Sequence, residues 1–302
     1  MLLNALHLLL SYQCTHECDH CFVWASPRAG GTMSLETLLA ILDQAQRVDG
    51  VADIYFEGGE PFLFYPLLVE GLRQSRERGF STGVVTNCYW ATTKADARLW
   101  LKPLKALDVA DLSLSSDVFH AGDFEDPRTA FVKEAAQDLG LPRTVIAIQP
   151  PAICDPSGTK GEPVVGGSVR FRGRAVTHLA TGLPRRPWSE LSECPDEDFL
   201  NPRRVHVDGH GNVHLCQGLL IGNLLETELK TIADRYDPHG HPVIGPLVDA
   251  GPAELVRRHG LVHDDGYVDP CHLCYEARVQ LRGRYPKALG PPQVYGATDT
   301  PT

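Results

Sequence analysis

The first half of the chain alternates short apolar runs with segments of helical periodicity, and this rhythm narrows the possible folds more than any other feature. Apolar and β-branched runs predict strands over residues 8–12, 52–56, 83–86, 109–115 and 144–148. Between them, apolar residues three and four apart predict helices over 35–48, 66–78, 94–101 and 128–139. Strands that alternate with helices of this length form βαβ units with right-handed connections, which predicts an α/β fold with a parallel sheet.

Beyond residue 150 the pattern changes. Ser168–Arg172 is expected to add a sixth strand, and a partial or full β/α barrel is the expected closure. Proline- and glycine-rich loops follow, and two alternating runs around an Asp-Gly-x-Gly-Asn turn predict a β-hairpin over Val205–Cys216. Helices are expected over 226–235 and 253–258, and an extended course over the surface over 290–302.

Composition argues against several classes of protein. The 302 residues include 28 Lys and Arg and 38 Asp and Glu, and the net charge of −10 argues against a protein that coats nucleic acid or an anionic membrane. No apolar run approaches the ~20 residues of a membrane-spanning helix, and the apolar N-terminus lacks the basic region and cleavage site of a secretory signal. We therefore expect a cytoplasmic protein with reduced thiols, whose nine cysteines indicate metal binding or catalysis rather than disulfides.

Three of the cysteines follow the first predicted strand with the spacing C-x3-C-x2-C: Cys14, Cys18 and Cys21. Three thiolates on one short loop can ligate three irons of a 4Fe–4S cluster, which leaves the fourth iron open to a small-molecule chelate. Two alternatives stay open at this point. A zinc ion could be held with His16 or His20 as an additional ligand, or the cysteines could be unliganded.

This loop resembles the cluster-binding loop of the radical S-adenosylmethionine (SAM) superfamily. A second feature typical of that family, Gly58-Gly59-Glu60-Pro61, ends the second predicted strand. The resemblance covers residues 5–175 and implies a partial (β/α)6 barrel, similar to a TIM barrel, over residues 1–185. It also implies that Cys14, Cys18 and Cys21 hold a SAM-binding 4Fe–4S cluster, and that residues 58–61 hold the methionine amino group of SAM, with Glu60 accepting a hydrogen bond.

Other positions at predicted strand ends follow from the same resemblance, although a polar residue there can simply face solvent. Thr86-Asn87-Cys88 stands where the family often reads Thr-Asn-Gly, and one arginine after the last strand could pair with the SAM carboxylate. The further residues expected to contact SAM are His20, Phe22, Thr86, Asn87, Ser115 and Arg172. The candidate catalytic residues, expected to contact the substrate, are Cys88, Asp117 and His120, with the alternative that Cys88, like Cys154, is a small buried apolar residue.

A second set of cysteines lies in the last third of the chain: Cys194, Cys216, Cys271 and Cys274. Four thiolates from a loop, a hairpin end and a C-x2-C turn can complete a structural zinc site or a second 4Fe–4S site. The arrangement resembles the twitch domain, a shortened SPASM domain that holds an auxiliary 4Fe–4S cluster. We therefore expect a small α+β twitch-like domain over residues 186–302, although the gap between Cys194 and Gly211 is slightly longer than in the family.

The resemblance implies a radical SAM enzyme that cleaves SAM reductively to a 5′-deoxyadenosyl radical, which abstracts hydrogen from a substrate. An oxidoreductase or peptide maturase that oxidises or crosslinks a ribosomally made peptide is the preferred interpretation, with a flavodoxin or ferredoxin as electron donor. The first strand begins within about ten residues of Met1, which leaves no room for an N-terminal peptide-recognition domain and weakens that interpretation. The alternatives are a sugar, cyclitol or nucleotide dehydrogenase or rearrangement enzyme, and a non-catalytic iron–sulfur electron carrier or scaffold.

Overall fold

The computed structural model describes residues 1–122, 126–154 and 164–297. Its main feature is an eight-stranded sheet, ordered β11-β10-β9-β1-β2-β3-β4-β5. Five of these strands come from the first half of the chain: β1 (Ala5–Leu9), β2 (Asp53–Glu57), β3 (Ser81–Thr86), β4 (Asp111–Ser115) and β5 (Arg143–Ile146). Each is parallel to its neighbour, so the strand–helix rhythm of the sequence correctly predicts a parallel α/β sheet.

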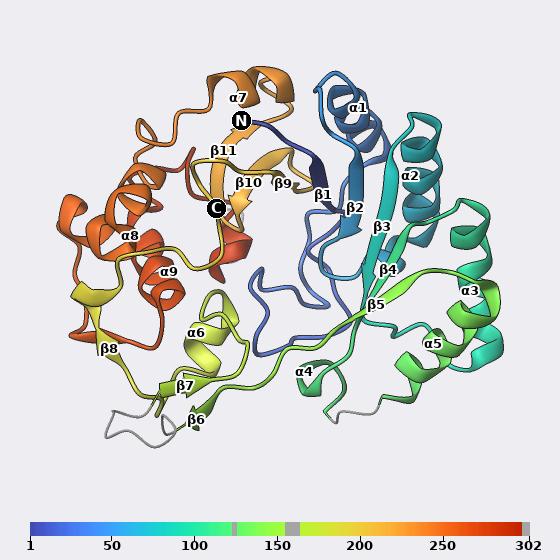
Figure 1. Ribbon diagram of the computed structural model, residues 1–302, viewed down its shortest axis with the longest axis horizontal. Helices are drawn as coiled ribbons and strands as arrows, with labels where there is room; N and C mark the ends of the chain where they lie inside the picture. The colour runs from blue at the N-terminus through green and yellow to red at the C-terminus, as the bar shows by residue number, and fades with distance from the viewer. Residues whose placement is uncertain (123–125, 155–163, 298–302) are drawn as a thin grey trace.

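Helices cover the outer face of this curved sheet (Figure 1). They are α1 (Leu35–Gln46), α2 (Tyr65–Glu77), α3 (Lys94–Ala106) and α5 (Pro127–Leu139). Three of them begin at a side-chain cap: Ser34, Thr93 and Asp126 accept hydrogen bonds from the first turns of α1, α3 and α5. Helix α2 has no such cap and has a proline in its first turn instead. Buried side chains such as Leu38, Ile54 and Leu72 fill the space between the helices and the sheet.

The last third of the chain extends the same sheet on the other side of β1. Strand β9 (Arg204–Val207) runs parallel to β1, and the predicted hairpin forms from β9 and β10 (Asn212–Cys216). Strand β11 (Leu219–Asn223) is antiparallel to β10 and is one edge of the sheet, and β5 is the other. In the described residues the sheet is therefore an open, partial barrel, while the assignment of 1–185 and 186–302 to separate domains stays a prediction.

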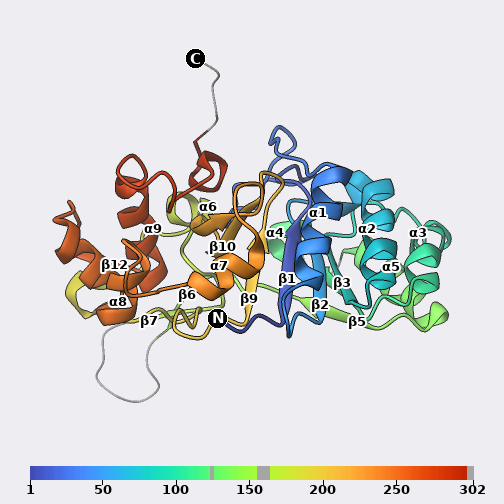
Figure 2. The same ribbon diagram turned by 90° about the horizontal axis from the view of Figure 1, so that it is seen from above.

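Helices α7 (Leu229–Arg235), α8 (Ile244–His259) and α9 (Pro270–Leu281) complete the C-terminal third. Figure 2 shows α8 and α9 at the end of the molecule opposite α2, α3 and α5. Helix α8 consists of two helical segments that meet at a kink, where Ala250 and Gly251 have non-helical backbone angles, and the predicted helix over 253–258 lies in the second segment. None of the helices in the described residues has the length and apolar character needed to cross a membrane.

Short elements join these parts. They are β6 (Ala152–Cys154), β7 (Val164–Gly166), β8 (Arg186–Pro187), β12 (Gly266–Tyr267), α4 (Val118–Ala121), α6 (Arg174–His178), η1 (Pro61–Phe64), η2 (Trp188–Glu190) and η3 (Pro292–Tyr295). Strands β6 and β7 form one small antiparallel pair, and β8 and β12 form another.

Two sequence-based predictions are wrong. Ser168–Arg172 is not a strand: it is an irregular segment between two left-handed glycines, Gly167 and Gly173, and Ser168 N donates to Gln149 O. The C-terminal segment, expected to run extended over the surface, instead forms η3 and buries Val294 and Tyr295 as far as the structure describes it. Residues 298–302 of that prediction lie outside the described part of the chain.

Candidate functional site

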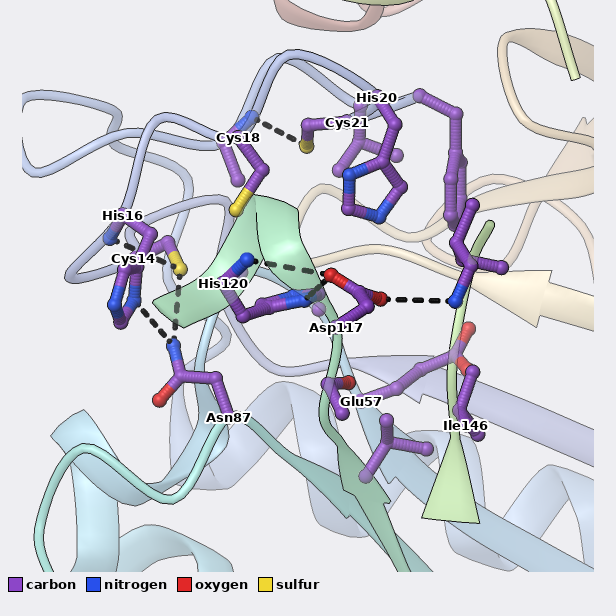
Figure 3. A pocket seen from close by; sticks show the side chains of 18 of the residues that line it. Cys14, His16, Cys18, His20, Cys21, Glu57, Asn87, Asp117, His120 and Ile146 are labelled. Atoms are coloured by element: carbon purple, nitrogen blue, oxygen red, sulfur yellow. Dashed lines mark hydrogen bonds and ion pairs between the residues drawn. The ribbon is translucent and has the colours of Figure 1, made fainter. Parts of the chain in front are cut away.

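A cavity of about 300 Å³ lies at the carboxyl ends of the parallel strands (Figure 3). Because all the strands from β1 to β5 point the same way, the residues that follow them meet at this one edge of the sheet. The lining includes most of the predicted contacts: Cys14, Cys18, His20, Cys21, Phe22, Gly58, Gly59, Thr86, Asn87, Ser115, Asp117, His120 and Arg172. Glu60, Pro61 and Cys88 are outside this lining.

The loop with the first three cysteines is held by a buried arginine. Arg174 is 5% exposed, and its guanidinium donates to Cys18 O at 2.7 Å and to Ala25 O at 2.8 Å. Two further donors face the sulfurs directly: Asn87 Nδ2 lies 3.5 Å from Cys14 Sγ, and the amide of Ala25 lies 3.3 Å from Cys21 Sγ. Burial raises the pKa of Cys14 to about 11, so a bound metal would have to supply the positive charge that stabilises the thiolate.

The distances between the cysteine sulfurs help to distinguish a zinc site from an iron–sulfur cluster. Four thiolates around one zinc ion, each at about 2.3 Å from it, would lie about 3.8 Å from one another. Among the described residues, the groups of three or more ligand atoms within 4.8 Å of one another are His7–Glu57–His206 and His20–Asp117–His120, and neither includes a cysteine. A cluster in which each thiolate binds a different iron tolerates wider spacing, so the sulfurs fit a cluster better than a zinc ion.

The Gly58-Gly59 pair allows the end of β2 to approach the cysteine loop closely. A Cβ atom on Gly58 would lie 2.4 Å from Ser11 O, and one on Gly59 would lie 2.1 Å from Gln13 O. The backbone amides of Gly59 and Glu60 donate to these same two carbonyl oxygens, at 2.6 and 2.9 Å. Any larger residue at either position would separate this strand end from the loop.

The Glu60 carboxylate is buried outside the lining of the cavity. It is 1% exposed and accepts hydrogen bonds from Phe62 N, from Thr86 Oγ1 and, at 2.7 Å, from Asn87 N. Burial raises the pKa of Glu60 to about 7, although these donors oppose the shift. In this structure Glu60 fixes the end of β3, and a direct hydrogen bond from SAM to Glu60 stays a prediction.

Asp117 and His120 form a hydrogen-bonded pair at the cavity wall. Asp117 Oδ1 lies 2.8 Å from His120 Nδ1, and Oδ2 accepts from Ile148 N at 3.0 Å. Burial alone would raise the pKa of Asp117, but the hydrogen bonds and His120 outweigh it and lower that pKa. An ionised Asp117 accepts the Nδ1 proton of His120 and leaves Nε2 as an acceptor. The His20 ring lies 5.2 Å from that of His120, and burial lowers the pKa of His20 to about 4.

The two cysteines outside both sets occupy different places. Cys88 is fully buried in the core with a φ of 62°, which corresponds to the alternative of a small apolar residue, and its contact with substrate stays a prediction. Cys154 is exposed on β6.

The second set of cysteines surrounds a smaller cavity. Cys194, Cys216, Cys271 and Cys274 all line it, together with Arg172 and Arg278. Arg278 is 2% exposed, donates to Gln217 O at 3.0 Å and lies against the rings of Tyr275 and Tyr295. A buried cation beside four cysteines would offset the negative charge of a thiolate-ligated cluster.

Arg172 lines both cavities and so lies between the two cysteine sets. Its Nη1 atom is 3.3 Å from Cys216 Sγ and 3.9 Å from Asp196 Oδ2, and its guanidinium lies 5.1 Å from the centre of the Phe22 ring. The contact seen here is thus with the second cysteine set, and pairing with a SAM carboxylate stays a prediction. Arg170 pairs with Asp196, and Arg174 is already engaged by the cysteine loop.

Comparison with known proteins agrees with this geometry. Residues 8–121 match the family model described as the Radical SAM superfamily. This part of the chain is a radical SAM domain. It contains the first three cysteines, the Gly58-Gly59 pair and the Asp117–His120 pair.

Among curated proteins, one relative has a role suggested by its name. YydG of Bacillus subtilis (strain 168), to which a role in peptide biosynthesis is attributed, is 27% identical over 112 residues, which are 37% of this chain and 35% of that protein. The chain aligns with about a third of the length of the curated relatives that it matches.

Two solved structures share the fold, each with a TM-score of 0.51. The complex of BtrN with AdoMet and 2-DOIA is 18% identical and covers 77% of this chain and 82% of its own. The complex of anSMEcpe with AdoMet and a Kp18Cys peptide is 11% identical and covers 93% of this chain and 97% of its own.

Proposed function

We propose that this protein is a radical SAM enzyme in which Cys14, Cys18 and Cys21 hold a 4Fe–4S cluster with one iron open to SAM. The observation that carries the proposal is that these three sulfurs line one cavity with Gly58 and Gly59, at the ends of β1 and β2. When bound, the cluster supplies the electron that cleaves SAM to methionine and a 5′-deoxyadenosyl radical, which takes a hydrogen atom from the substrate. The residues of this chain position SAM and exclude water.

The Asp117–His120 pair is the proposed acid–base group of the site. Asp117 orients the imidazole through Nδ1, so His120 Nε2 can accept a proton from a substrate hydroxyl or amide once the neighbouring C–H bond has been broken. His120 lines the same cavity as the cysteines, so this proton acceptor and the hydrogen-abstraction site share one space.

The second cysteine set is the proposed site of an auxiliary 4Fe–4S cluster in a twitch-like domain. Support comes from the four cysteines around one cavity and the buried cation Arg278 beside them, and among the described residues no three of the sulfurs lie within 4.8 Å of one another. Such a site could accept an electron from the substrate, which favours net oxidation. Arg172 would then lie between the two clusters.

A peptide is the preferred substrate. The attributed role of YydG supports it, and so does the open edge of the sheet beside the cavity. Val145 and Ile146 on β5, Ile153 on β6 and Val164 on β7 are 38% to 57% exposed, and Ile146 also lines the cavity. An edge strand flanked by apolar side chains can take up an extended peptide. A sugar, cyclitol or nucleotide is the alternative substrate, and the fold shared with BtrN, whose structure holds 2-DOIA, supports a small molecule.

Anaerobic reconstitution tests the proposal. Wild type is compared with a Cys14/Cys18/Cys21→Ala variant and a Cys271/Cys274→Ala variant for iron, sulfide, zinc and dithionite-driven formation of 5′-deoxyadenosine. We expect about eight irons in wild type and about four in each variant, as two 4Fe–4S sites require. Formation of 5′-deoxyadenosine should disappear only in the first variant.

Other outcomes of the same experiment contradict the proposal. Two clusters without SAM cleavage would indicate an electron carrier or scaffold. Zinc without iron would indicate a metal-stabilised binding module. If wild type holds only about four irons and the first variant holds none, the proposed radical SAM site is supported but the proposed auxiliary cluster is contradicted. The reason for preferring net oxidation is then lost as well.

A further inference from the structure

Three ligand-type side chains meet on the inner face of the sheet, separate from both cysteine sets. His7 lies on β1, Glu57 on β2 and His206 on β9, which are neighbouring strands. His7 is directly opposite His206 across the β1–β9 pair. The three come from distant parts of the sequence and are brought together only because β9 adds to β1.

The donor atoms of this His7–Glu57–His206 cluster converge. Glu57 Oε2 lies 3.1 Å from His7 Nδ1, and Oε1 lies 2.7 Å from His206 Nδ1. One ligand atom from each residue lies within 4.8 Å of the other two. Two nitrogen or oxygen ligands bound at about 2.1 Å to one ion are about 3.0–3.4 Å apart. The 3.1 Å separation lies within that range, whereas the 2.7 Å separation is that of a hydrogen bond, so a bound ion would move Glu57 and His206 apart by a few tenths of an ångström.

The surrounding residues hold the rings in place. The His7 ring stacks on Tyr55 at 4.9 Å, and Tyr55 lies over Gly83, where a Cβ atom would come within 2.2 Å of that ring. The side chains of His7, Glu57 and His206 are 19%, 18% and 12% exposed, so small ions and water can reach them. No hydrogen bond to the second nitrogen of either imidazole is found within the described residues.

We propose that His7, Glu57 and His206 bind one divalent ion of the zinc class. Two imidazoles and one carboxylate suit Zn²⁺ or Fe²⁺, and three protein ligands leave a coordination position open. Glu57 also lines the large cavity, so an ion held here would lie at its wall. The open position would take an oxygen or nitrogen atom of the substrate, which makes the ion a substrate-binding group. This site uses none of the cysteines and stands apart from the proposed cluster chemistry.

Zinc titration of the reconstituted protein tests this site. Wild type, Glu57→Gln, His206→Gln and His7→Gln are titrated calorimetrically with Zn²⁺, after circular dichroism has verified their folding. His239→Gln is the matched control, because His239 forms a comparable His–carboxylate pair with Asp249 on the surface. We expect wild type and the control to bind one more zinc per chain than Glu57→Gln, and each single His variant to bind that zinc about tenfold or more weakly.

X-ray absorption at the zinc edge identifies the zinc ligands in wild type, so the site can be tested even if a variant does not fold. In wild type, nitrogen and oxygen ligands at about 2.0–2.1 Å support the site, whereas sulfur at about 2.3 Å would mean that the zinc occupies cysteines. Equal zinc uptake by wild type and a folded Glu57→Gln, or sulfur-only ligation, would overturn the proposal and leave the cluster as a hydrogen-bonded group. Neither result would affect the iron count or the cleavage of SAM.

Discussion

At the scale of single residues, buried polar side chains hold the site together. Arg174, Glu60 and Asp208 are each 5% exposed or less, and each binds groups from segments far apart in the chain. Buried charges of this kind are stabilising only when every partner is present. Glu60 and Asp208 stand in motifs that the sequence shows, a Gly-Gly-Glu-Pro segment and a hairpin turn, but the pattern of apolar residues does not predict that their carboxylates are buried, and Arg174 has no motif at all.

Asp208 is the most heavily bonded of these three. Its carboxylate accepts from Tyr12 Oη, from two backbone amides of the hairpin turn, from Asn212 Nδ2 and from buried His214. Burial alone would raise the pKa of Asp208, but these bonds outweigh it and lower that pKa to about 2. The carboxylate therefore ties the strand β1 segment to the β9–β10 hairpin in its ionised form.

The stability contributed by Asp208 should depend on pH. Because the folded pKa is depressed, the contribution is fully present above the unfolded pKa of about 4 and is lost as pH falls toward about 2. Asp208→Asn should lower the free energy of unfolding by ~2 kcal/mol at pH 6. Urea unfolding of both proteins at pH 6 and pH 3 measures this difference, which should shrink to roughly half at pH 3. A difference independent of pH would show that the lost bonds, not the charge, matter.

At the scale of elements, the sequence predicts which segments form strands, but it does not always predict which strands pair with each other. Five parallel strands and the hairpin form as predicted, because apolar alternation and turn residues act locally. The predicted bounds of the first strand are wrong, since β1 spans Ala5–Leu9 and not 8–12. The parallel pairing of β9 with β1 was not predicted, because the apolar pattern of a strand does not determine which strand lies next to it. Consequently the cysteine loop could be predicted from spacing alone, whereas the His7–Glu57–His206 cluster, which that pairing creates, could not.

The failed prediction of a strand over Ser168–Arg172 has a physical reason. The alternation Ser-Val-Arg-Phe-Arg is typical of a strand, but Gly173 turns the chain with a φ of 61° against the cysteine loop. A Cβ atom on Gly173 would lie 2.5 Å from Cys21 O. The segment thus contacts the loop instead of extending the sheet.

Gly173→Ala should consequently disturb the first cysteine site. Gly182→Ala is a matched control, because Gly182 also has a positive φ of 77° but nothing within 4 Å of its Cβ position. We expect the control to lose only ~1 kcal/mol of stability and to keep its iron, whereas Gly173→Ala loses about half of the iron after reconstitution. Iron assays of the two variants side by side measure this. Equal retention would show that the Gly173–Cys21 contact is dispensable.

At the scale of the whole molecule, one sheet crosses the predicted domain boundary. Strand β1 has β2 on one side and β9 on the other, and Leu6 and Leu8 on β1 are completely buried. The C-terminal segment adds a second connection, since Gln293 Nε2 donates to Trp24 O at 2.7 Å. The two cysteine sets therefore belong to one packed body.

This continuity predicts that the two parts unfold together. Trp24, Trp90 and Trp100 report on the first part of the chain and Trp188 on the second, so Trp188→Phe restricts tryptophan fluorescence to the first. In urea, the fluorescence of Trp188→Phe and its far-ultraviolet circular dichroism should show coincident transitions. Separate midpoints would instead support two independent units that divide near residue 185.

The pairing of β1 with β9 also means that β1 cannot complete its contacts until much later in translation. Strand β1 leaves the ribosome before its β9 partner, which follows roughly 200 residues later. At ~5–20 residues per second this is a wait of about 10–40 s. During that interval the cysteine loop next to β1 has left the ribosome before the hairpin and C-terminal segment that later pack beside it. The thiols of Cys14, Cys18 and Cys21 are thus accessible from one side for longer in the nascent chain than in the folded protein.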